Sequence, residues 1–298
     1  MDQAHGLREM MKQEAEDISG GKYSLETSGG TSATRVISVT SGKGGVGKTN
    51  IVGNLAISLR RLGKRVLVLD GDLGLANIDI IFGLSPAYNI KHVVDGEKSL
   101  SDIIVKGPEQ IQIIPAGSGV QDLVDLTQGQ KLNLLNEFDG LEEEFDVFLI
   151  DTGAGISSNV TYFGIAADER IVVVTSEPTS ITDAYALMKV MYTKHGTNTF
   201  KLVVNMVDHE EEARAVFKNL SNAIVRFLKG ISLEYLGFIP RDDNLEIAVR
   251  RQATVVKCFP GSPASDGFSR LADQLLVASP KTAQDGNIKF FWKKFVTA

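Results

Sequence analysis

The sequence predicts an α/β fold: a doubly wound, mostly parallel sheet with helices on both faces, plus short terminal helices. Two observations support this prediction. Between residues 35 and 279, short apolar runs typical of buried strands alternate with stretches in which apolar residues follow a helical period. In addition, a glycine-rich segment joins the first expected strand to the first expected helix, where folds of this class bind phosphates.

The expected elements divide the chain into four parts. Residues 1–17 contain a short helix, 18–34 form a flexible linker rich in Gly, Ser and Thr, 35–279 form the α/β domain, and 280–298 form a linker and an amphipathic helix. Within the domain, strands are expected at 35–40, 65–70, 111–115, 146–151, 170–175, 200–206 and 234–239. Helices are expected near 48–62, 121–137, 158–167, 180–194, 209–229, 244–250 and 264–278.

Composition narrows the class of protein. A chain of 298 residues can form one large α/β domain, and its formal net charge of −6 argues against general nucleic-acid binding, although a local basic patch is compatible with it. The single cysteine, Cys258, excludes an internal disulfide and a cluster held by cysteine pairs. No apolar run reaches the ~20 residues of a membrane span, and no signal peptide is visible. We therefore expect a cytoplasmic protein.

The glycine-rich segment matches the phosphate-loop pattern G-x-x-x-x-G-K-[ST] from Gly42 to Thr49. Glycines allow the backbone to wrap closely around phosphate oxygens and to point its N–H groups inward. Lys48 is expected to reach the β- and γ-phosphates, and the Thr49 hydroxyl to coordinate Mg²⁺. The segment therefore predicts nucleotide binding by Gly42, Lys43, Gly44, Gly45, Val46, Gly47, Lys48 and Thr49.

Acidic residues follow two other expected strands. Asp70 and Asp72 flank a glycine after the strand 65–70, and Asp151 closes the apolar run 146–151. Acids in a phosphate site hold Mg²⁺ through water or orient the attacking water, so Asp70 and Asp151 are expected near the metal. Two simpler interpretations stay open: a solvated turn for the first pair, and a helix cap for Asp151.

Two further features lie after strands of the predicted sheet. Gly153 and Gly155 make the segment behind Asp151 small and flexible, as in a switch loop that shifts with the γ-phosphate. Asn205 ends the strand 200–206, and its amide can donate to and accept from the edge of a base. Asn at a strand end is also common in ordinary loops, so the prediction for Asn205 depends on where the fold places it.

The phosphate loop has a second lysine, Lys43, which the general pattern does not require. With this lysine the loop resembles that of the MinD/ParA ATPases, in which it reaches across a dimer onto the partner's nucleotide. The run Asp70–Asn77 resembles the MinD branch and gives Asp72 the role of positioning water. The resemblance implies ATP and Mg²⁺ as cofactors, an ATP-dependent homodimer, and catalysis by Lys43, Lys48 and Asp72.

The same resemblance assigns three more sites. An acid that faces the second lysine in MinD-like proteins corresponds to Asp183, which is thus a candidate partner of Lys43. The segment after strand 234–239 corresponds to backbone contacts with adenine, here Pro240, Arg241 and Asp242. Within the family, the run Glu177–Tyr185 and the pair Phe290-Phe291 favour the flagellar number regulators FlhG and FleN, and the resemblance covers about residues 35–298.

The start of the chain resembles the activator helix of these flagellar regulators. Ala4, Leu7 and Met11 follow a helical period, and the linker comes after them. From the residues alone, the segment is either a disordered chain start or a peptide that docks on a partner. The resemblance implies that it stimulates an FlhF-type GTPase through Asp2, Gln3, Ala4, Leu7 and Arg8.

The end of the chain has the pattern of a membrane-targeting helix. One face is apolar and the other is basic, with no acid after Asp285. The apolar positions are Ile288, Phe291, Trp292, Phe295 and Val296, and the basic ones are Lys289, Lys293 and Lys294. The alternative is a final helix docked on the α/β domain through the same apolar face.

The resemblance implies an ATP-switched monomer–dimer cycle on the cytoplasmic face of the inner membrane, with polar placement as a further expectation. Such a protein would regulate flagellar number and placement. A flagellar transcription regulator and flagellar switch-complex proteins are additional candidate partners. Two alternatives remain: a cell-division or DNA-partition ATPase on the same core, and an adaptor whose nucleotide is only structural.

Overall fold

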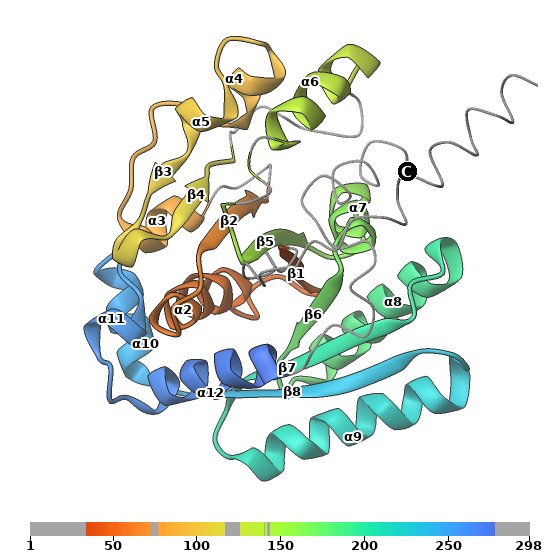
Figure 1. Cartoon of the computed structure of the whole chain (residues 1–298). Coiled ribbons are helices and arrows are strands. Elements are labelled where there is room, and N and C mark those ends of the chain that lie inside the picture. The colour runs from red at the N-terminus through yellow and green to blue at the C-terminus, as the bar shows by residue number, and fades with distance from the viewer. Residues whose placement is uncertain (1–33, 73–76, 117–125, 140, 142–143, 278–298) are drawn as a thin grey trace, which may run out of the picture. The chain divides into compact units, whose positions relative to one another are not determined.

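The domain is built around one eight-stranded sheet. The computed structural model describes residues 34–72, 77–116, 126–139, 141 and 144–277 (Figure 1). The strands lie in the order β3-β4-β2-β5-β1-β6-β7-β8. β3 is antiparallel to β4, and all other neighbouring strands are parallel. The chain extends from β1 toward both edges of the sheet, so the predicted doubly wound, mostly parallel sheet is confirmed.

The elements have the following bounds. The strands are β1 (Arg35–Ser41), β2 (Val66–Gly71), β3 (Val105–Lys106), β4 (Gln112–Ile114), β5 (Val147–Ala154), β6 (Glu169–Val174), β7 (Thr199–Val207) and β8 (Ser232–Pro240). The helices are α2 (Lys48–Arg61), α3 (Ile78–Phe82), α4 (Ile90–Val94), α5 (Leu100–Ile103), α6 (Gln128–Asp139), α7 (Ser158–Ala166), α8 (Pro178–His195), α9 (Glu210–Phe227), α10 (Asp243–Arg250), α11 (Val255–Cys258) and α12 (Pro263–Val277). A 3₁₀ turn, η1 (Pro108–Gln110), joins β3 to β4.

The structure confirms the predicted strands and most of the predicted helices. The expected helix 121–137 is the least accurate, because α6 begins at Gln128 and residues 117–125 lie outside the described part. The elements α3, α4, α5, α11 and β3 were not predicted. Each has at most five residues, which is too short to show a helical or alternating period.

Helices cover both faces of the sheet. On one face, α2 and α12 pack against the side chains of Ile37 and Val39 in β1. On the opposite face, α4, α6 and α7 pack over Val36 of the same strand, and α8 and α9 cover the half of the sheet formed by β6 and β7. Successive residues of a buried strand point to opposite faces, which explains why these strands read as continuous apolar runs.

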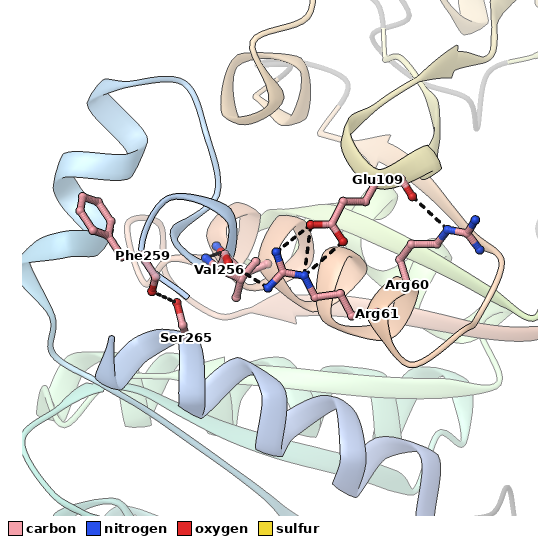
Figure 2. A network of polar contacts seen from close by, with 7 residues as sticks. Arg60, Arg61, Glu109, Val256, Phe259 and Ser265 are labelled. Atoms are coloured by element: carbon pink, nitrogen blue, oxygen red, sulfur yellow. Dashed lines mark hydrogen bonds and ion pairs between the residues drawn. The ribbon is translucent and has the colours of Figure 1, made fainter. Parts of the chain in front are cut away.

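The far end of α2 is fixed by a network of polar contacts (Figure 2). Arg61 forms an ion pair of 2.7 Å with Glu109 in η1 and donates to the Val256 carbonyl of α11 at 2.9 Å. Asn54, also in α2, accepts from the Val256 N–H at 3.2 Å. Exposed ion pairs contribute little stability, so the main effect is geometric. The helix that begins at the phosphate loop is thus held to the edge of the sheet and to α11.

The limits of the domain are close to those expected. Thr34, which we placed in the linker, is buried and donates from its hydroxyl to the Phe145 carbonyl at 2.7 Å, so it already belongs to the domain. The predicted helix and linker in residues 1–33 and the predicted tail in residues 278–298 lie outside the described residues. Among the helices that are described, none has the length and apolar character needed to cross a bilayer.

Candidate nucleotide-binding site

The phosphate loop connects β1 to α2 at the carboxyl end of the central strand. Gly45 has a φ of 77° and Gly47 a φ of 87°, a left-handed conformation that glycine adopts without strain. Gly47 is the residue before the first turn of α2, and no side chain caps the N–H groups of that turn. A helix N-terminus preceded by such a loop provides several N–H donors for an anion.

Neighbouring elements hold the loop closely. A side chain on Gly42 would overlap the backbone of Asp183 and Ala184 in α8, so only glycine fits there. Asn205, at the end of β7, donates from Nδ2 to the Val46 carbonyl at 2.8 Å. These contacts come from helix α8 and from strand β7, and they fix the shape of the loop before any ligand binds.

Asp151 is the most deeply buried acid of the site. It lies in β5 and is 1% exposed, and its Oδ1 has no hydrogen-bond partner among the described residues. Burial, with a smaller effect from the Asp70 charge, raises the pKa of Asp151 to about 8, while the Thr49 hydroxyl and Lys48 act in the opposite direction. A buried carboxylate with an unpaired oxygen needs a cation or a proton to be stable.

Lys48 complements this acid. Its side chain is buried at the start of α2, and burial lowers the pKa of its ammonium group, whereas the charges of Asp151 and Asp72 partly restore it. The structure therefore brings together Lys48, Thr49, Asp72 and Asp151, from the loop and two strand ends. This is the cluster that the sequence predicted at the carboxyl end of the sheet.

Asp70 has a more specific arrangement than we predicted. It pairs in register with Asp151 across β2 and β5. Its carboxylate accepts from three backbone N–H groups: Asp72 at 3.2 Å, Asn77 at 2.9 Å and Ile78 at 3.1 Å. Burial raises the pKa of Asp70 to about 6 in spite of these bonds. Asp70 lies beside Asp151, as a residue near the metal would, but its oxygens anchor the segment that leads to α3.

Asp72 is positioned by this anchoring. Its N–H is bound to Asp70, and its Oδ1 lies 3.7 Å from the point that a Cβ on Gly153 would occupy. Gly153 is still part of β5, which runs to Ala154, three residues beyond the expected strand end. Gly155 has a φ of 89° and donates to the Ser41 carbonyl at 2.9 Å. The switch segment predicted from Gly153 and Gly155 is thus held against β1 in this conformation.

Lys43 contacts a different acid from the one we expected. Its ammonium nitrogen lies 2.5 Å from Glu177 Oε2 and 3.1 Å from Thr179 Oγ1, both at the start of α8. Asp183, the predicted partner, instead lies with its backbone against Gly42. The correction follows from which atoms face the loop: Glu177 presents its carboxylate to Lys43, whereas Asp183 meets the loop through its backbone. The run Glu177–Tyr185 contained the available sequence signal, but we used it only for the resemblance and assigned the acid to Asp183.

The predicted adenine contacts have structural roles in this conformation. Asp242 caps α10 by accepting from Asn244 N at 2.9 Å, and its second oxygen accepts from Ala264 N at 3.0 Å. Arg241 donates its backbone N–H to the Val207 carbonyl at 2.8 Å and lies 3.6 Å from Asp208. Pro240 ends β8. Arg241 and Pro240 remain at the carboxyl edge of the sheet beside Asn205, so base contacts from this segment stay a prediction.

The residues present fit Mg²⁺ bound together with a nucleotide. The unpaired Oδ1 of Asp151 and the Thr49 hydroxyl are oxygen ligands of the type that Mg²⁺ prefers. No group of three or more acidic, histidine or cysteine side chains that could hold a metal occurs in the described ranges. Phosphate oxygens and water would therefore have to complete the coordination, as is usual for Mg²⁺ in nucleotide sites.

Comparisons with known proteins agree with this geometry. A family model described as an AAA domain matches residues 34–203. The chain is 41% identical to antiactivator FleN of Pseudomonas aeruginosa, over 91% of this chain and 97% of that protein. It is 36% identical to the flagellum site-determining protein YlxH of Helicobacter pylori, over 88% and 90% of the two chains.

A solved structure extends the comparison to a bound nucleotide. The septum site-determining protein MinD of Pyrococcus horikoshii, in complex with Mg-ADP, is 25% identical and superposes with a TM-score of 0.65. The superposition covers 82% of this chain and 98% of MinD. Together with the phosphate loop, the buried Lys48 and the acids beside it, these matches show that the chain belongs to the MinD/ParA-type ATPases, which use ATP and Mg²⁺, and within them to the group that contains FleN and YlxH.

Proposed function

We propose that this ATPase is a molecular switch that alternates between a monomer and an ATP-bound dimer whose subunits meet at their phosphate loops. The observation that carries the proposal is the contrast between the two loop lysines. Lys48 is buried beside Asp151 and Asp72, whereas the side chain of Lys43 is 38% exposed and lies against the start of α8. Lys48 therefore acts within its own site, whereas Lys43 is accessible to a second subunit.

Each residue then has a defined task. The loop backbone from Gly42 to Thr49 and the Lys48 ammonium would hold the phosphates, and Thr49 with Asp151 would hold Mg²⁺. Asp72 would orient the attacking water, since it is anchored through Asp70 at the edge of the site. Mg²⁺ would neutralise the charge that develops on the phosphates. Lys43 of a second subunit would add a cation in trans, which is worth roughly 10³–10⁵ in rate where such help is known.

In the cell, we propose that the switch regulates flagellar number and placement. The support is the similarity to FleN, called an antiactivator, and to YlxH, called a flagellum site-determining protein. A role in cell division or DNA partition on the same core is the alternative. Counting flagella and measuring cell length in a deletion strain separates the two, because a division role would alter cell length and leave flagellar number unchanged.

Two segments would connect the switch to its partners. The amino-terminal helix, with Gln3 near its start, would stimulate an FlhF-type GTPase, and the carboxy-terminal segment with Trp292 and Phe295 would bind the inner membrane. The support for both is the sequence pattern. A flagellar transcription regulator and switch-complex proteins are further candidate partners, which co-purification from flagellated cells would test.

Sedimentation velocity in the presence of ATP and Mg²⁺ tests the switch. Asp72→Ala should bind ATP and accumulate as a dimer, because water is no longer oriented for hydrolysis. Lys43→Ala should bind ATP and remain a monomer. Lys48→Ala should lose ATP binding, and Lys106→Ala, an exposed lysine of the edge strand β3, should behave as wild type. An Asp72→Ala protein that remains monomeric with bound ATP would contradict the proposal.

A further inference from the structure

Two stretches of this acidic protein contain no acid at all. Residues 184–207 and 213–233 lack Asp and Glu, although the whole chain has 37 acidic residues and a net charge of −6. The same stretches contain seven cations: Lys189, Lys194, Lys201, Arg214, Lys218, Arg226 and Lys229. They cover α8 from Ala184 onward, all of β7, α9 from Ala213 onward and the start of β8. The four acids between these stretches, Asp208, Glu210, Glu211 and Glu212, lie before α9 or in its first turn, so the net positive charge lies toward the carboxyl ends of α8 and α9.

The helix ends in these stretches lie side by side. The hydroxyl of Tyr192, near the end of α8, donates to the Lys229 carbonyl just beyond α9 at 2.8 Å. The Ser232 N–H at the start of β8 donates to the Asn198 carbonyl at 2.7 Å. Figure 1 shows that α8 and α9 both end where β7 and β8 begin. These helices therefore end at the amino-terminal ends of the strands, whereas the phosphate loop lies at the carboxyl-terminal ends.

Some of the cations are already neutralised, and others are not. Lys201 lies 3.3 Å from Glu169 and 3.4 Å from Glu234, and Arg214 is paired with Glu210. The remaining cations near the helix ends are exposed, and within the described residues none of them has a carboxylate at ion-pair distance. They are Lys189, Lys194, Arg226 and Lys229. We call these four residues, with Val225 and Phe227, the basic end.

Two large apolar side chains are exposed within the basic end. Val225 is 70% exposed and Phe227 is 64% exposed. The guanidinium carbon of Arg226 lies 5.1 Å from the centre of the Phe227 ring. An exposed aliphatic and aromatic pair among cations is stabilised at the boundary between lipid headgroups and acyl chains, where both kinds of group find partners. The phosphates of a nucleic acid would engage the cations and leave Val225 in water.

The last helix of the domain also runs toward the amino-terminal ends of the strands. At its start, Ala264 donates to Asp242 beyond the end of β8, whereas Gln274 lies beside Gly237 in the middle of that strand. Helix α12 thus runs antiparallel to β8 and ends at Val277, which is 81% exposed. The segment whose sequence predicts membrane targeting follows directly. The segment therefore attaches on the opposite face of the sheet from α8 and α9, at the end of a helix that runs in the direction of the basic end.

We propose that the basic end is a second membrane contact, made by the folded domain with anionic lipid headgroups. It rests on the proposed membrane association of this protein, but it assigns that association to residues outside the tail. Each Lys or Arg near an anionic surface strengthens binding by about fivefold, and the effect decreases with added salt. Val225 and Phe227 add apolar contact that salt does not weaken.

Vesicle binding of the full chain with ATP and Mg²⁺ tests this proposal. Vesicles of phosphatidylglycerol and phosphatidylcholine are compared with vesicles of phosphatidylcholine alone. Arg226→Glu with Lys229→Glu should reduce affinity for the anionic vesicles by about tenfold or more. Lys91→Glu with Lys106→Glu makes the same change in net charge at exposed lysines elsewhere and should have a much smaller effect. Equal losses in the two double variants would overturn the proposal, because the contact would then be non-specific.

A fluorescence measurement reports directly on position 227. The chain has one tryptophan, Trp292, so Trp292→Phe with Phe227→Trp places the only indole in the basic end. On anionic vesicles its emission should shift to the blue, and lipids brominated on their acyl chains should quench it. Absence of both changes while the protein is vesicle-bound would overturn the proposal.

Truncation after Gln284 separates this contact from the tail. The truncated protein should retain weak, salt-sensitive binding to anionic vesicles, and the Arg226→Glu, Lys229→Glu pair should abolish it. Suppose that the truncated protein does not bind and that the Arg226→Glu, Lys229→Glu double variant has no effect in the full chain. The proposed membrane contact of the basic end is then wrong, while the proposal for the tail stands. If truncation has no effect and the pair abolishes binding, the tail proposal fails and this one stands. Tighter binding of duplex DNA than of vesicles by the basic end would also contradict it.

Discussion

The ammonium group of Lys43 lies 2.5 Å from the carboxylate of Glu177, so the second lysine of the phosphate loop is bound within its own chain. The hydrogen bond and charge of Lys43 lower the pKa of Glu177, which keeps this carboxylate ionised at neutral pH. Both side chains are exposed, with 38% and 62% of their areas accessible, so the pair is weak and exchangeable. A lysine that acts on a partner's nucleotide must first leave this contact.

Glu177→Gln should therefore shift the equilibrium toward the ATP-bound dimer. The amide cannot form the ion pair, so less free energy is needed to release Lys43. We expect the protein concentration for half-maximal dimerisation to fall by about two- to fivefold, since an exposed ion pair contributes little free energy. Sedimentation equilibrium with ATP measures this concentration. Glu246→Gln, which breaks the exposed pair with Arg250 at 3.6 Å, is the matched control and should have no effect. Weaker dimerisation of Glu177→Gln would show that Glu177 instead supports the dimer.

Gly42→Ala should damage the site by steric overlap. The added methyl group would meet the backbone of Asp183 and Ala184, which cannot move without shifting α8. Overpacking of this kind costs about 1–3 kcal/mol, and urea unfolding followed by circular dichroism would measure the loss. Gly44→Ala is the control, because no atom lies within 4 Å of its added carbon. Equal stabilities of the two variants would mean that the loop and α8 are less tightly packed than described.

The stability of the nucleotide-free protein should fall as pH rises. Burial raises the pKa of Asp151 to about 8 and that of Asp70 to about 6, both above the ordinary value of 3.8. The folded state therefore binds more protons than the unfolded chain, and its stability decreases from about pH 4 to about pH 8. Asp151→Asn should flatten this decrease and raise stability at pH 8 by up to a few kcal/mol.

A control acid should show the opposite trend. The ion pair with Arg65 lowers the pKa of Asp146, so its contribution is present at neutral pH and is lost as pH falls through the folded pKa. Asp146→Asn should therefore remove stability at pH 7 and have little effect at pH 3. Thermal unfolding of the three proteins across pH 3 to 9, without nucleotide or metal, measures the slopes. A slope that Asp151→Asn leaves unchanged would contradict the burial of an unpaired carboxylate.

The amino-terminal segment should act on another protein. A peptide of residues 1–20 should accelerate GTP hydrolysis by the cognate FlhF-type GTPase in the absence of the ATPase domain. Gln3→Ala should reduce this stimulation and leave the protein's own ATPase rate unchanged, because a linker rich in Gly and Ser transmits little force. Loss of ATP-dependent dimerisation on deletion of residues 1–20 would instead place the segment in the ATPase core.

Local patterns predicted the strands, the long helices and the phosphate loop, because each is encoded by neighbouring residues. The contact between Lys43 and Glu177 joins residues 134 positions apart, and no pattern within either segment specifies it. Asp70 was predicted near the metal from its place after a strand, but its three backbone hydrogen bonds depend on how the chain turns toward α3. The basic end was also missed as a surface, because its cations belong to two helices that only the fold brings together.

The most direct test of the switch mixes two inactive variants. Lys43→Ala retains Asp72 but cannot supply the lysine in trans, whereas Asp72→Ala supplies the lysine but cannot orient water. In a mixed dimer, the site of the Lys43→Ala subunit receives Lys43 from its partner and is complete. Asp72→Ala also pairs with itself, so Lys43→Ala is added in excess; each mixed dimer has one complete site of two, and the mixture should regain up to about half of the wild-type ATPase rate per dimer. A mixture as inactive as either variant alone would contradict the action of Lys43 across the dimer.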